Sequence, residues 1–358
     1  MLKPKISLIC PSYNHKKYIK PFINSILVQS ERNFELIIID DASTDGNLAE
    51  ISDIKDARIK IFKNDYNRGV NFCITKACAK AKADIIAFTP SDDIYSSRYI
   101  ELILKEFKNK KSDVVFIAME YIDEKGRLLP GSWDLPVNKT QREIFVDYFL
   151  RGPQLPTNGM SFKKSVIAKL LPLDYGVLQY SDTQLHSNFL FRNKITMLNS
   201  HLIYTRISKE AASARRSDVS LRESIETEKL MNTFVNLIGE NTRVFNNFFG
   251  GHPLVKNQKI TPKTIPFWLA RIAMTAESFE KKSWGYKKIM EFISSGKNSD
   301  LLHKEYKFDF GQYLNLGKII ADLNPSVKLK KYRKRFQRLL LIFIVFITLS
   351  ALSLLLLF

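Results

Sequence analysis

The sequence predicts an α/β protein with a mostly parallel central sheet, followed by a helical C-terminal region and a terminal transmembrane helix. Three observations predict this architecture. Apolar strand-like segments alternate with helix-like segments through the first third of the chain, as in sheets whose parallel strands are joined by helices. Polar clusters follow several of the apolar segments. The segment 339–358 has no charged residue and is long enough to span about 30 Å as a helix.

The elements of the first third follow from apolar runs and from the turn residues that interrupt them. The expected strands cover 6–10, 33–39, 59–63 and 84–88, and the expected helices cover 17–29, 47–54 and 70–82. Crossovers of this kind make the strands parallel, so their carboxyl ends meet at one edge of the sheet. We therefore expect the polar clusters that follow the strands to form a single site, since ligands bind at that edge in open α/β sheets.

Two adjacent carboxylates, Asp92 and Asp93, follow the apolar strand over 84–88. Neighbouring carboxylates repel each other unless a cation lies between them. Mg²⁺ and Mn²⁺ prefer oxygen ligands and commonly share them with substrate phosphates. The pattern therefore predicts a metal and diphosphate site. The alternative is a solvated turn or a helix N-cap, because Ser-Asp-Asp suits both.

Three other side chains at the same edge suit a nucleotide. Tyr13 offers a ring on which a base can stack, and Arg68 lies in a glycine-flanked turn from which it can reach a base or a phosphate. A carboxylate at Asp41 only accepts hydrogen bonds, so it selects a base with a ring N–H, which uracil, thymine and guanine have. Each residue also has a structural alternative: Tyr13 as a staple for the next helix, Asp40 or Asp45 as a helix cap, and Arg68 as a solvated charge.

Taken together, four motifs resemble the bacterial family 2 glycosyltransferases, which have the GT-A fold. The motifs are Pro11-Ser12-Tyr13-Asn14, Asp40-Asp41-Ala42-Ser43-Thr44-Asp45-Gly46, Asn67-Arg68-Gly69 and Ser91-Asp92-Asp93. The resemblance covers roughly residues 5–207. It implies a GT-A nucleotide-binding sandwich and the transfer of a sugar, with inversion, from a nucleotide diphosphate sugar to a hydroxyl. It also implies Mg²⁺ or Mn²⁺ as cofactor, and a UDP-linked donor is favoured.

The resemblance assigns roles to individual residues of this chain. Pro11 and Tyr13 would line the base pocket, Asp41 would bind the base with Asp40 beside it, and Arg68 would contact the nucleotide. Asp92 would contact the diphosphate and the metal, with Asp93 favoured as the direct metal ligand. The chain departs from the family at Thr89 and Pro90, where an aspartate and a small residue often stand, and at Cys73-Ile74-Thr75.

The acceptor side of the site is expected further along the chain. Asn158, Gly159 and Met160 precede a segment, 161–164, that resembles the family's segment facing the acceptor. Asp182 lies where the family carries an acidic residue ahead of a helix. An inverting transfer needs a carboxylate to take the proton of the acceptor hydroxyl, and we expect Asp182 to be this base. The alternative is that Asp182 caps the helix expected over 183–191.

Four regions are expected along the chain. Residues 1–208 would form the GT-A glycosyltransferase domain, 209–327 a helical region, 328–338 a basic juxtamembrane segment, and 339–358 a single-pass tail anchor. Basic residues flank a membrane span on its cytoplasmic side, so the expected location is the cytoplasmic face of the inner (plasma) membrane. Membrane lipid is then a partner, and a lipid-linked or cell-envelope glycan is the expected acceptor.

The formal net charge of +19, from 55 basic and 36 acidic residues, predicts an anionic partner. Much of this charge lies beside the apolar tail, where attraction to anionic lipid explains it, so no nucleic-acid partner is expected. A dehydrogenase is excluded because no Gly-x-Gly-x-x-Gly follows the first strand. The competing hypothesis is a non-catalytic, membrane-anchored module that binds a nucleotide sugar or scaffolds an assembly with a degenerate transferase fold. Thr89 in place of an aspartate supports it.

Overall fold

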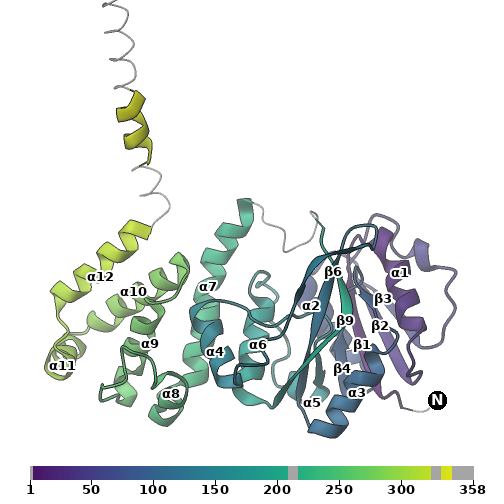
Figure 1. Ribbon diagram of the computed structural model, residues 1–358, viewed down its shortest axis with the longest axis horizontal. Coiled ribbons are helices and arrows are strands. Elements are labelled where there is room, and N and C mark those ends of the chain that lie inside the picture. Colours follow the sequence, from purple (N-terminus) through teal and green to yellow (C-terminus); the bar gives the residue numbers. More distant parts are fainter. Residues whose placement is uncertain (1–2, 209–216, 324–331, 341–358) are drawn as a thin grey trace, which may run out of the picture. The chain divides into compact units, whose positions relative to one another are not determined.

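The computed structural model describes residues 3–208, 217–323 and 332–340 of the chain (Figure 1). The chain divides into two compact units, Met1–Gly250 and Gly251–Phe358. The catalytic domain expected over 1–208 lies within the first unit. That unit extends to Gly250 because α7 (Ser217–Ile238) packs on α6 (Ser181–Arg192) and α8 (Thr242–Phe249) packs on α4 (Gln141–Leu150).

Four parallel strands form the first half of the sheet, in the order β3, β2, β1, β4 (Figure 1). They are β1 (Ile6–Ser12), β2 (Phe34–Asp40), β3 (Ile59–Lys63) and β4 (Ile85–Phe88). In the register of β1 and β2, Ser12 pairs with Asp40, so the two strands end side by side. This half of the sheet confirms the parallel strands that the sequence predicts.

The second half of the sheet is mixed, so the sheet is mostly parallel only on its N-terminal side. The short strand β8 (Ser161–Lys163) runs antiparallel to both β4 and β6 (Val114–Ile122), and β6 pairs in parallel with β9 (Ile195–Arg206). At the edges, β5 (Ile94–Tyr95) and β7 (Leu128–Trp133) are antiparallel to β9 and β6. These pairings depend on contacts far apart in sequence, which local patterns do not encode.

Helices α1 (Lys16–Leu27) and α3 (Tyr99–Lys110) cover the core beside the sheet. The buried residues of α1 recur at helical spacing, which gives the helix one apolar face; they include Ile19, Phe22, Ile23 and Ile26. Helix α2 (Val70–Lys80) instead contacts β1 and β2. The helix expected to end at residue 54 is only a 3₁₀ turn, η1 (Ala49–Ile51), in a loop held by polar side chains.

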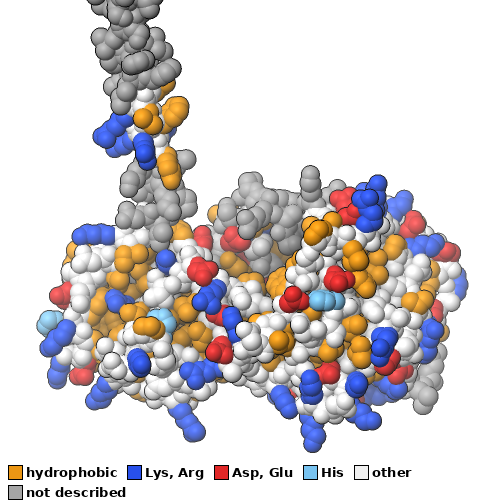
Figure 2. Space-filling model, in the orientation of Figure 1, with side chains coloured by type: hydrophobic (Ala, Val, Ile, Leu, Met, Phe, Trp, Pro, Cys, Tyr) orange, Lys and Arg blue, Asp and Glu red, His pale blue; other side chains and the backbone are white. Residues whose placement is uncertain are grey.

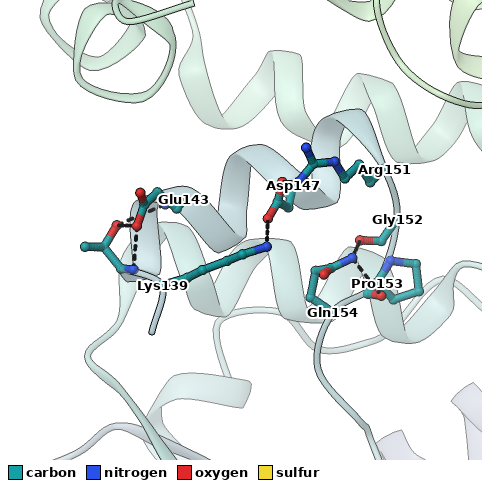
Figure 3. A network of polar contacts seen from close by, with 8 residues as sticks. Lys139, Glu143, Asp147, Arg151, Gly152, Pro153 and Gln154 are labelled. Carbon is teal, nitrogen blue, oxygen red and sulfur yellow. Dashed lines mark hydrogen bonds and ion pairs between the residues drawn. The ribbon is translucent and has the colours of Figure 1, made fainter. Parts of the chain in front are cut away.

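Helix α4 begins with a capping box, in which Thr140 and Glu143 satisfy each other's backbone N–H groups. Figure 3 shows the ion pairs at its other end, where the Asp147 carboxylate accepts from Lys139 at 2.6 Å and from Arg151 at 2.7 Å. Gln154 follows and bonds the carbonyl of Gly152. These contacts fix the start of the segment 151–160, which leads to the acceptor residues that the sequence predicts.

Aromatic side chains hold the helices of the first unit together. Phe145 of α4 lies 5.1 Å from Phe234 of α7 and 4.5 Å from Phe248 of α8, between ring centroids. Phe149 contacts Phe249 in the same cluster. The short helix α5 (Lys164–Ile167) continues directly from β8. The result is a helical layer whose packing places α6, and with it Asp182, beside the sheet.

The second unit contains a 3₁₀ turn and four helices among its described residues up to 323, and the described residues 332–340 are also helical. The turn and the four helices are η2 (Pro262–Thr264), α9 (Ile265–Ala273), α10 (Phe279–Ile293), α11 (Gly296–Tyr306) and α12 (Phe310–Leu323). Asp309 and Gln312 form a capping box at the start of α12, in which each side chain accepts a hydrogen bond from the other residue's backbone N–H.

The tail anchor expected over 339–358 lies outside the described residues, apart from its first two. Within the part of the chain that the structure covers, no helix is long and apolar enough to cross a membrane. The described part of the basic segment, 332–338, is helical and exposed. Figure 2 shows basic side chains on this short helix and others scattered over the visible face of each unit.

Candidate active site

Ser12 joins the ends of three parallel strands. Its carbonyl accepts a hydrogen bond from the Asp41 N–H at 2.9 Å, and its Oγ lies 3.0 Å from the Oγ of Ser91. The Ser91 hydroxyl also lies 2.7 Å from the Nδ1 of His15. The motifs after β1, β2 and β4 therefore meet at one edge of the sheet, as the parallel arrangement predicts.

Asp41 is only 4% exposed and holds the turn that carries Arg68. Its Oδ1 accepts from the Arg68 N–H and its Oδ2 from the Gly69 N–H, both at 2.8 Å. The amide of Asn64 donates to Oδ1 at 2.7 Å. Each carboxylate oxygen accepts two or more bonds, so Asp41 keeps acceptor capacity for a base N–H while it orders the nucleotide turn.

Asp40 is fully buried and builds the neighbouring loop. Its carboxylate accepts from the Asn47 amide at 3.0 Å and from the Ser43 N–H at 3.2 Å. Asp45 accepts from the Lys16 N–H at 2.8 Å, so it caps α1 from another loop instead of a helix of its own. Any influence of Asp40 on a nucleotide therefore acts through the loop that it holds.

The remaining predicted nucleotide residues lie around this turn. The Tyr13 side chain is 43% exposed, so its ring is free for stacking, and Pro11 is half-buried. The exposed Arg68 guanidinium carbon lies 3.6 Å from the ring centroid of Phe72 and 5.3 Å from that of Tyr66. Such cation–π contacts orient the guanidinium without neutralising its charge, so it remains able to bind an anion.

Asp93 is 1% exposed and is bonded only by neutral donors in the structure's hydrogen-bond network. Its Oδ2 accepts from the Asn158 amide at 2.7 Å, and its Oδ1 accepts from the backbone N–H of Arg206 at 3.0 Å. Burial, and next the neighbouring Asp92 carboxylate, raise the pKa of Asp93 well above its usual value. The Asp92 side chain is half-buried. A divalent cation would relieve the electrostatic cost of this pair.

The pair fits a metal that shares its ligands with a diphosphate. The described residues contain no group of three or more His, Cys, Asp or Glu side chains that could hold an ion alone. One or two carboxylates completed by phosphate oxygens is a common arrangement for Mg²⁺. The Arg206 guanidinium does not replace the cation, because it donates to the carbonyls of Asp92 and Asp123.

The predicted acceptor segment, 158–160, contains one half-buried residue and two buried ones. Asn158 is half-buried and bonds Asp93, whereas Gly159 and Met160 are buried. Gly159 has φ +71°, and an added Cβ would lie 1.8 Å from the Cδ1 of Ile203. Any direct contact with an acceptor would therefore come from Asn158 or the half-buried Thr157.

Asp182 lies in the first turn of α6, and it does not occupy the N-cap position, which belongs to Tyr180. Its Oδ1 accepts from the Thr183 N–H at 2.6 Å, and its Oδ2 accepts from the Thr157 hydroxyl at 3.1 Å. The side chain is half-buried. It thus combines local hydrogen bonding in the helix with a contact to the acceptor segment.

A closed ring of hydrogen bonds joins all these motifs, and we call it the edge ring. Asn158 bonds Asp93, Thr157 bonds Asp182, and Ser181 bonds Asn71 at the start of α2. Its members are Ser12, Asp41, Arg68, Gly69, Asn71, Ser91, Asp93, Thr157, Asn158, Ser181 and Asp182, joined by these bonds and by neighbouring positions in the chain. Predicted residues from the nucleotide, metal and base groups, namely Asp41, Arg68, Asp93 and Asp182, therefore belong to one connected network.

Several residues of this site were not found by sequence reasoning. Asn71, Thr157 and His15 make the bonds that connect separate motifs, but as isolated polar residues they carry no recognisable pattern. Arg206, at the end of β9, also borders this site, because its guanidinium donates to the carbonyl of Asp92. The Asn71 amide also donates to the carbonyls of Asp174 and Val177, which fixes the loop before α6.

Comparison with known proteins places this geometry among sugar-transferring enzymes. Residues 7–168 match the model of Glycosyl transferase family 2. This matched range contains the four motifs and ends before Asp182. The chain is 25% identical over 268 residues to an uncharacterized glycosyltransferase of Nostoc sp., covering 67% of this chain and 78% of the relative.

A second relative and a solved structure carry more specific names. The chain is 26% identical over 215 residues to the UDP-Glc:alpha-D-GlcNAc-diphosphoundecaprenol beta-1,3-glucosyltransferase WfgD of Escherichia coli, covering 59% of this chain and 80% of that protein. The crystal structure of S. aureus TarS 1–349 in complex with UDP-GlcNAc superposes with a TM-score of 0.56 at 18% identity, covering 80% of this chain and 88% of TarS. At this identity the likeness to TarS establishes the fold.

Proposed function

This chain is a glycosyltransferase that uses a nucleotide-sugar donor, and we propose that it moves the sugar from a UDP-linked donor to a hydroxyl of a lipid-linked or cell-envelope glycan, with inversion. The observation that carries this proposal is the edge ring, which joins base-binding, diphosphate-binding and proton-accepting side chains around one site. Because the chain is a glycosyltransferase, the competing hypothesis of a non-catalytic, membrane-anchored module is not favoured.

In the proposed reaction Asp182 takes the proton from the acceptor hydroxyl. The acceptor oxygen then forms a bond to the anomeric carbon, and the bond between that carbon and the diphosphate oxygen breaks. The electron pair leaves with the nucleoside diphosphate, and attack from the opposite face inverts the anomeric centre. Asp182 suits this role because it is half-buried and lies next to Thr157 and Asn158, where an acceptor would approach.

The choice of uridine rests on the acceptor chemistry of Asp41. A carboxylate pairs with the ring N–H of uracil, thymine or guanine, whereas the corresponding ring nitrogen of cytosine carries no hydrogen. Asp41 therefore disfavours cytosine, and the names of the relatives favour uracil among the other bases. Tyr13 would stack on the base, and Pro11 and Arg68 would lie beside the nucleotide. The name of WfgD includes UDP-Glc, and the solved TarS complex contains UDP-GlcNAc, which is consistent with a uridine donor.

Mg²⁺ or Mn²⁺ is proposed as cofactor, held by Asp92 and Asp93 together with the diphosphate. When bound, the ion would neutralise charge that develops on the leaving diphosphate. The protein's own contribution is to fix the Asp93 carboxylate, which accepts from the Asn158 amide and from the Arg206 N–H. Asp92, which is more exposed, would face the substrate.

The acceptor and the location are proposed from the C-terminal sequence. A tail anchor over 339–358, with its basic flank at the cytoplasmic face of the inner membrane, would confine the enzyme to the surface that displays lipid-linked glycans. The name of WfgD describes such a lipid-linked acceptor. Confinement to one surface raises the effective concentration of enzyme and acceptor.

The proposal is tested by incubating the full chain with Mn²⁺ and a panel of UDP-, GDP- and CDP-sugars, and by measuring the nucleotide released by hydrolysis or transfer. We expect turnover with a UDP-sugar and almost none with Asp182→Asn. Asp174→Asn is the matched control, because Asp174 is an exposed carboxylate paired with Lys229 at 2.6 Å on the loop before α6. Wild-type turnover by Asp182→Asn would refute the assignment of the base.

A further inference from the structure

A buried histidine lies behind the proposed base. His186 and Asp182 are four residues apart in α6, so they share one face of the helix. His186 is 0% exposed and packs edge-on against Phe116, with 4.9 Å between ring centroids. Neither the family motifs nor the proposed reaction uses this residue. A fully buried imidazole needs hydrogen-bond partners at both ring nitrogens, since unsatisfied buried polar atoms are costly.

Both nitrogens of His186 have such partners. Its Nδ1 lies 2.9 Å from the hydroxyl of Tyr148 in α4, and its Nε2 lies 3.4 Å from the Thr157 Oγ1. The Thr157 hydroxyl in turn lies 3.1 Å from the Asp182 Oδ2. A continuous path of hydrogen bonds therefore runs from the core of the first unit to the proposed base.

The direction of each hydrogen bond follows from the carboxylate. An ionised Asp182 can only accept, so Thr157 gives its single proton to Asp182. The Thr157 oxygen must then accept from His186, which places the imidazole proton on Nε2. Nδ1 is left as an acceptor for the Tyr148 hydroxyl at 2.9 Å, and the Leu155 carbonyl is a longer alternative acceptor at 3.5 Å. The Tyr148 oxygen accepts from the Leu155 N–H at 3.0 Å. Every donor in the path thus points toward Asp182.

The imidazole stays neutral in this arrangement. Burial lowers the pKa of His186 to about 4, although the nearby Asp182 carboxylate opposes the shift. A neutral ring has one donor and one acceptor nitrogen, which is what the path requires. The Asp182 carboxylate acts electrostatically on both Tyr148 of α4 and His186 of α6. Burial also raises the pKa of Tyr148, so its hydroxyl keeps its proton.

We infer that Tyr148, His186 and Thr157 form a one-way hydrogen-bond relay that positions Asp182 as the base for the transfer. This inference rests on the proposed role of Asp182. The relay moves no proton, because His186 remains neutral and Tyr148 remains protonated. It acts by orienting the Asp182 carboxylate, since the hydroxyl proton of Thr157 is directed at its Oδ2.

The first test compares Thr157→Val with Thr157→Ser in the full chain. Valine keeps the shape of threonine without the hydroxyl, whereas serine keeps the hydroxyl. We expect Thr157→Val to lower kcat for UDP-sugar hydrolysis about 10-fold with KM little changed, because Asp182 loses the donor that orients it. Thr157→Ser should behave like wild type. A kcat of Thr157→Val equal to that of wild type would overturn the relay.

The second test separates the two nitrogens of His186. Glutamine places an amide N–H near the position of Nε2 and can still donate to Thr157, whereas asparagine places its amide near Nδ1 and cannot reach Thr157. We expect His186→Gln to keep kcat near wild type. His186→Asn should reproduce the changes of Thr157→Val. Equal loss in both variants would mean that His186 serves packing alone, which would overturn its place in the relay.

The third test observes which ring nitrogen of His186 carries the proton. Its outcome can be read separately from the activity of the Asp182 variant. ¹⁵N NMR of the histidine-labelled full chain, assigned with His186→Gln, should show the proton of His186 on Nε2 at pH 7; a proton on Nδ1 overturns the relay. If Asp182→Asn is inactive while Thr157→Val keeps the wild-type rate, only the relay fails. If Asp182→Asn is fully active, the base assignment and the relay fail together.

Discussion

Gly159→Ala tests whether the segment 157–160, which bonds both Asp93 and Asp182, requires the backbone conformation observed at Gly159. Gly159 has φ +71°, and a Cβ at this position would lie 1.8 Å from the Cδ1 of Ile203 and 3.0 Å from its Cγ1. Ile203 is fully buried in β9, so it has little room to move. The same short segment carries Thr157 and Asn158, which bond Asp182 and Asp93.

The expected cost is the sum of two contributions. A left-handed backbone costs a non-glycine residue about 1–2 kcal/mol, and overpacking of a well-packed core costs about 1–3 kcal/mol. We therefore expect Gly159→Ala to lower the free energy of unfolding by about 2–5 kcal/mol, measured by urea denaturation of the full chain. Turnover of a UDP-sugar should also fall, because Thr157 and Asn158 would shift relative to the two carboxylates.

Two controls isolate these contributions. Gly126→Ala has a similar φ of +81°, but its nearest atom is an Ile94 Cδ1 at 3.9 Å, so it should show only the backbone cost of about 1–2 kcal/mol. Ile203→Val removes the clashing Cδ1. In the wild-type chain, Ile203→Val should lower the free energy of unfolding by about 1 kcal/mol. In the Gly159→Ala variant, the same substitution should leave that free energy unchanged or raise it. The reasoning fails if the effects of Gly159→Ala and Ile203→Val on the free energy of unfolding are additive. It also fails if Gly159→Ala costs no more than Gly126→Ala, because the Cβ at Gly159 would then not be in close contact with Ile203.

Three further predictions concern the nucleotide base, the buried His186 and the C-terminal membrane anchor. UDP should bind more tightly than CDP in calorimetry, because only uracil offers a ring N–H to Asp41; equal affinities would remove Asp41 from base recognition. The pKa of His186 lies at about 4 in the folded state and about 6.5 when unfolded, so the unfolded state binds more protons between these values and stability falls with decreasing pH. From pH 6.5 to 5.0 this histidine should remove roughly 2 kcal/mol, a slope that His186→Gln should lack in urea titrations. Deleting 328–358 should move the protein from the membrane to the soluble fraction of a cell lysate, and a full chain found in the soluble fraction would contradict the anchor.

Local patterns were sufficient for the parallel half of the sheet. The apolar runs of β1, β2 and β4 are each bounded by turn residues, so strand identity and the common edge could be read from the sequence. The acidic residues after these strands followed from the same pattern. Elements with a short-range signal, such as α1 with its single apolar face, were also predicted within a few residues.

Other features depend on contacts that local patterns do not contain. The antiparallel insertion of β8 between β4 and β6 joins segments about 75 and 50 residues apart in sequence, and nothing in its three residues indicates their partners. The path from Tyr148 through His186 to Asp182 likewise requires α4 and α6 to be packed together before its residues meet.

A crystal structure of the full chain with UDP and Mn²⁺ would show whether the edge ring surrounds the donor. We expect the uracil between Tyr13 and the Asp41 carboxylate, and the diphosphate with its metal at Asp92 and Asp93. Density for UDP and Mn²⁺ at another surface, with the edge ring unchanged and empty, would contradict it.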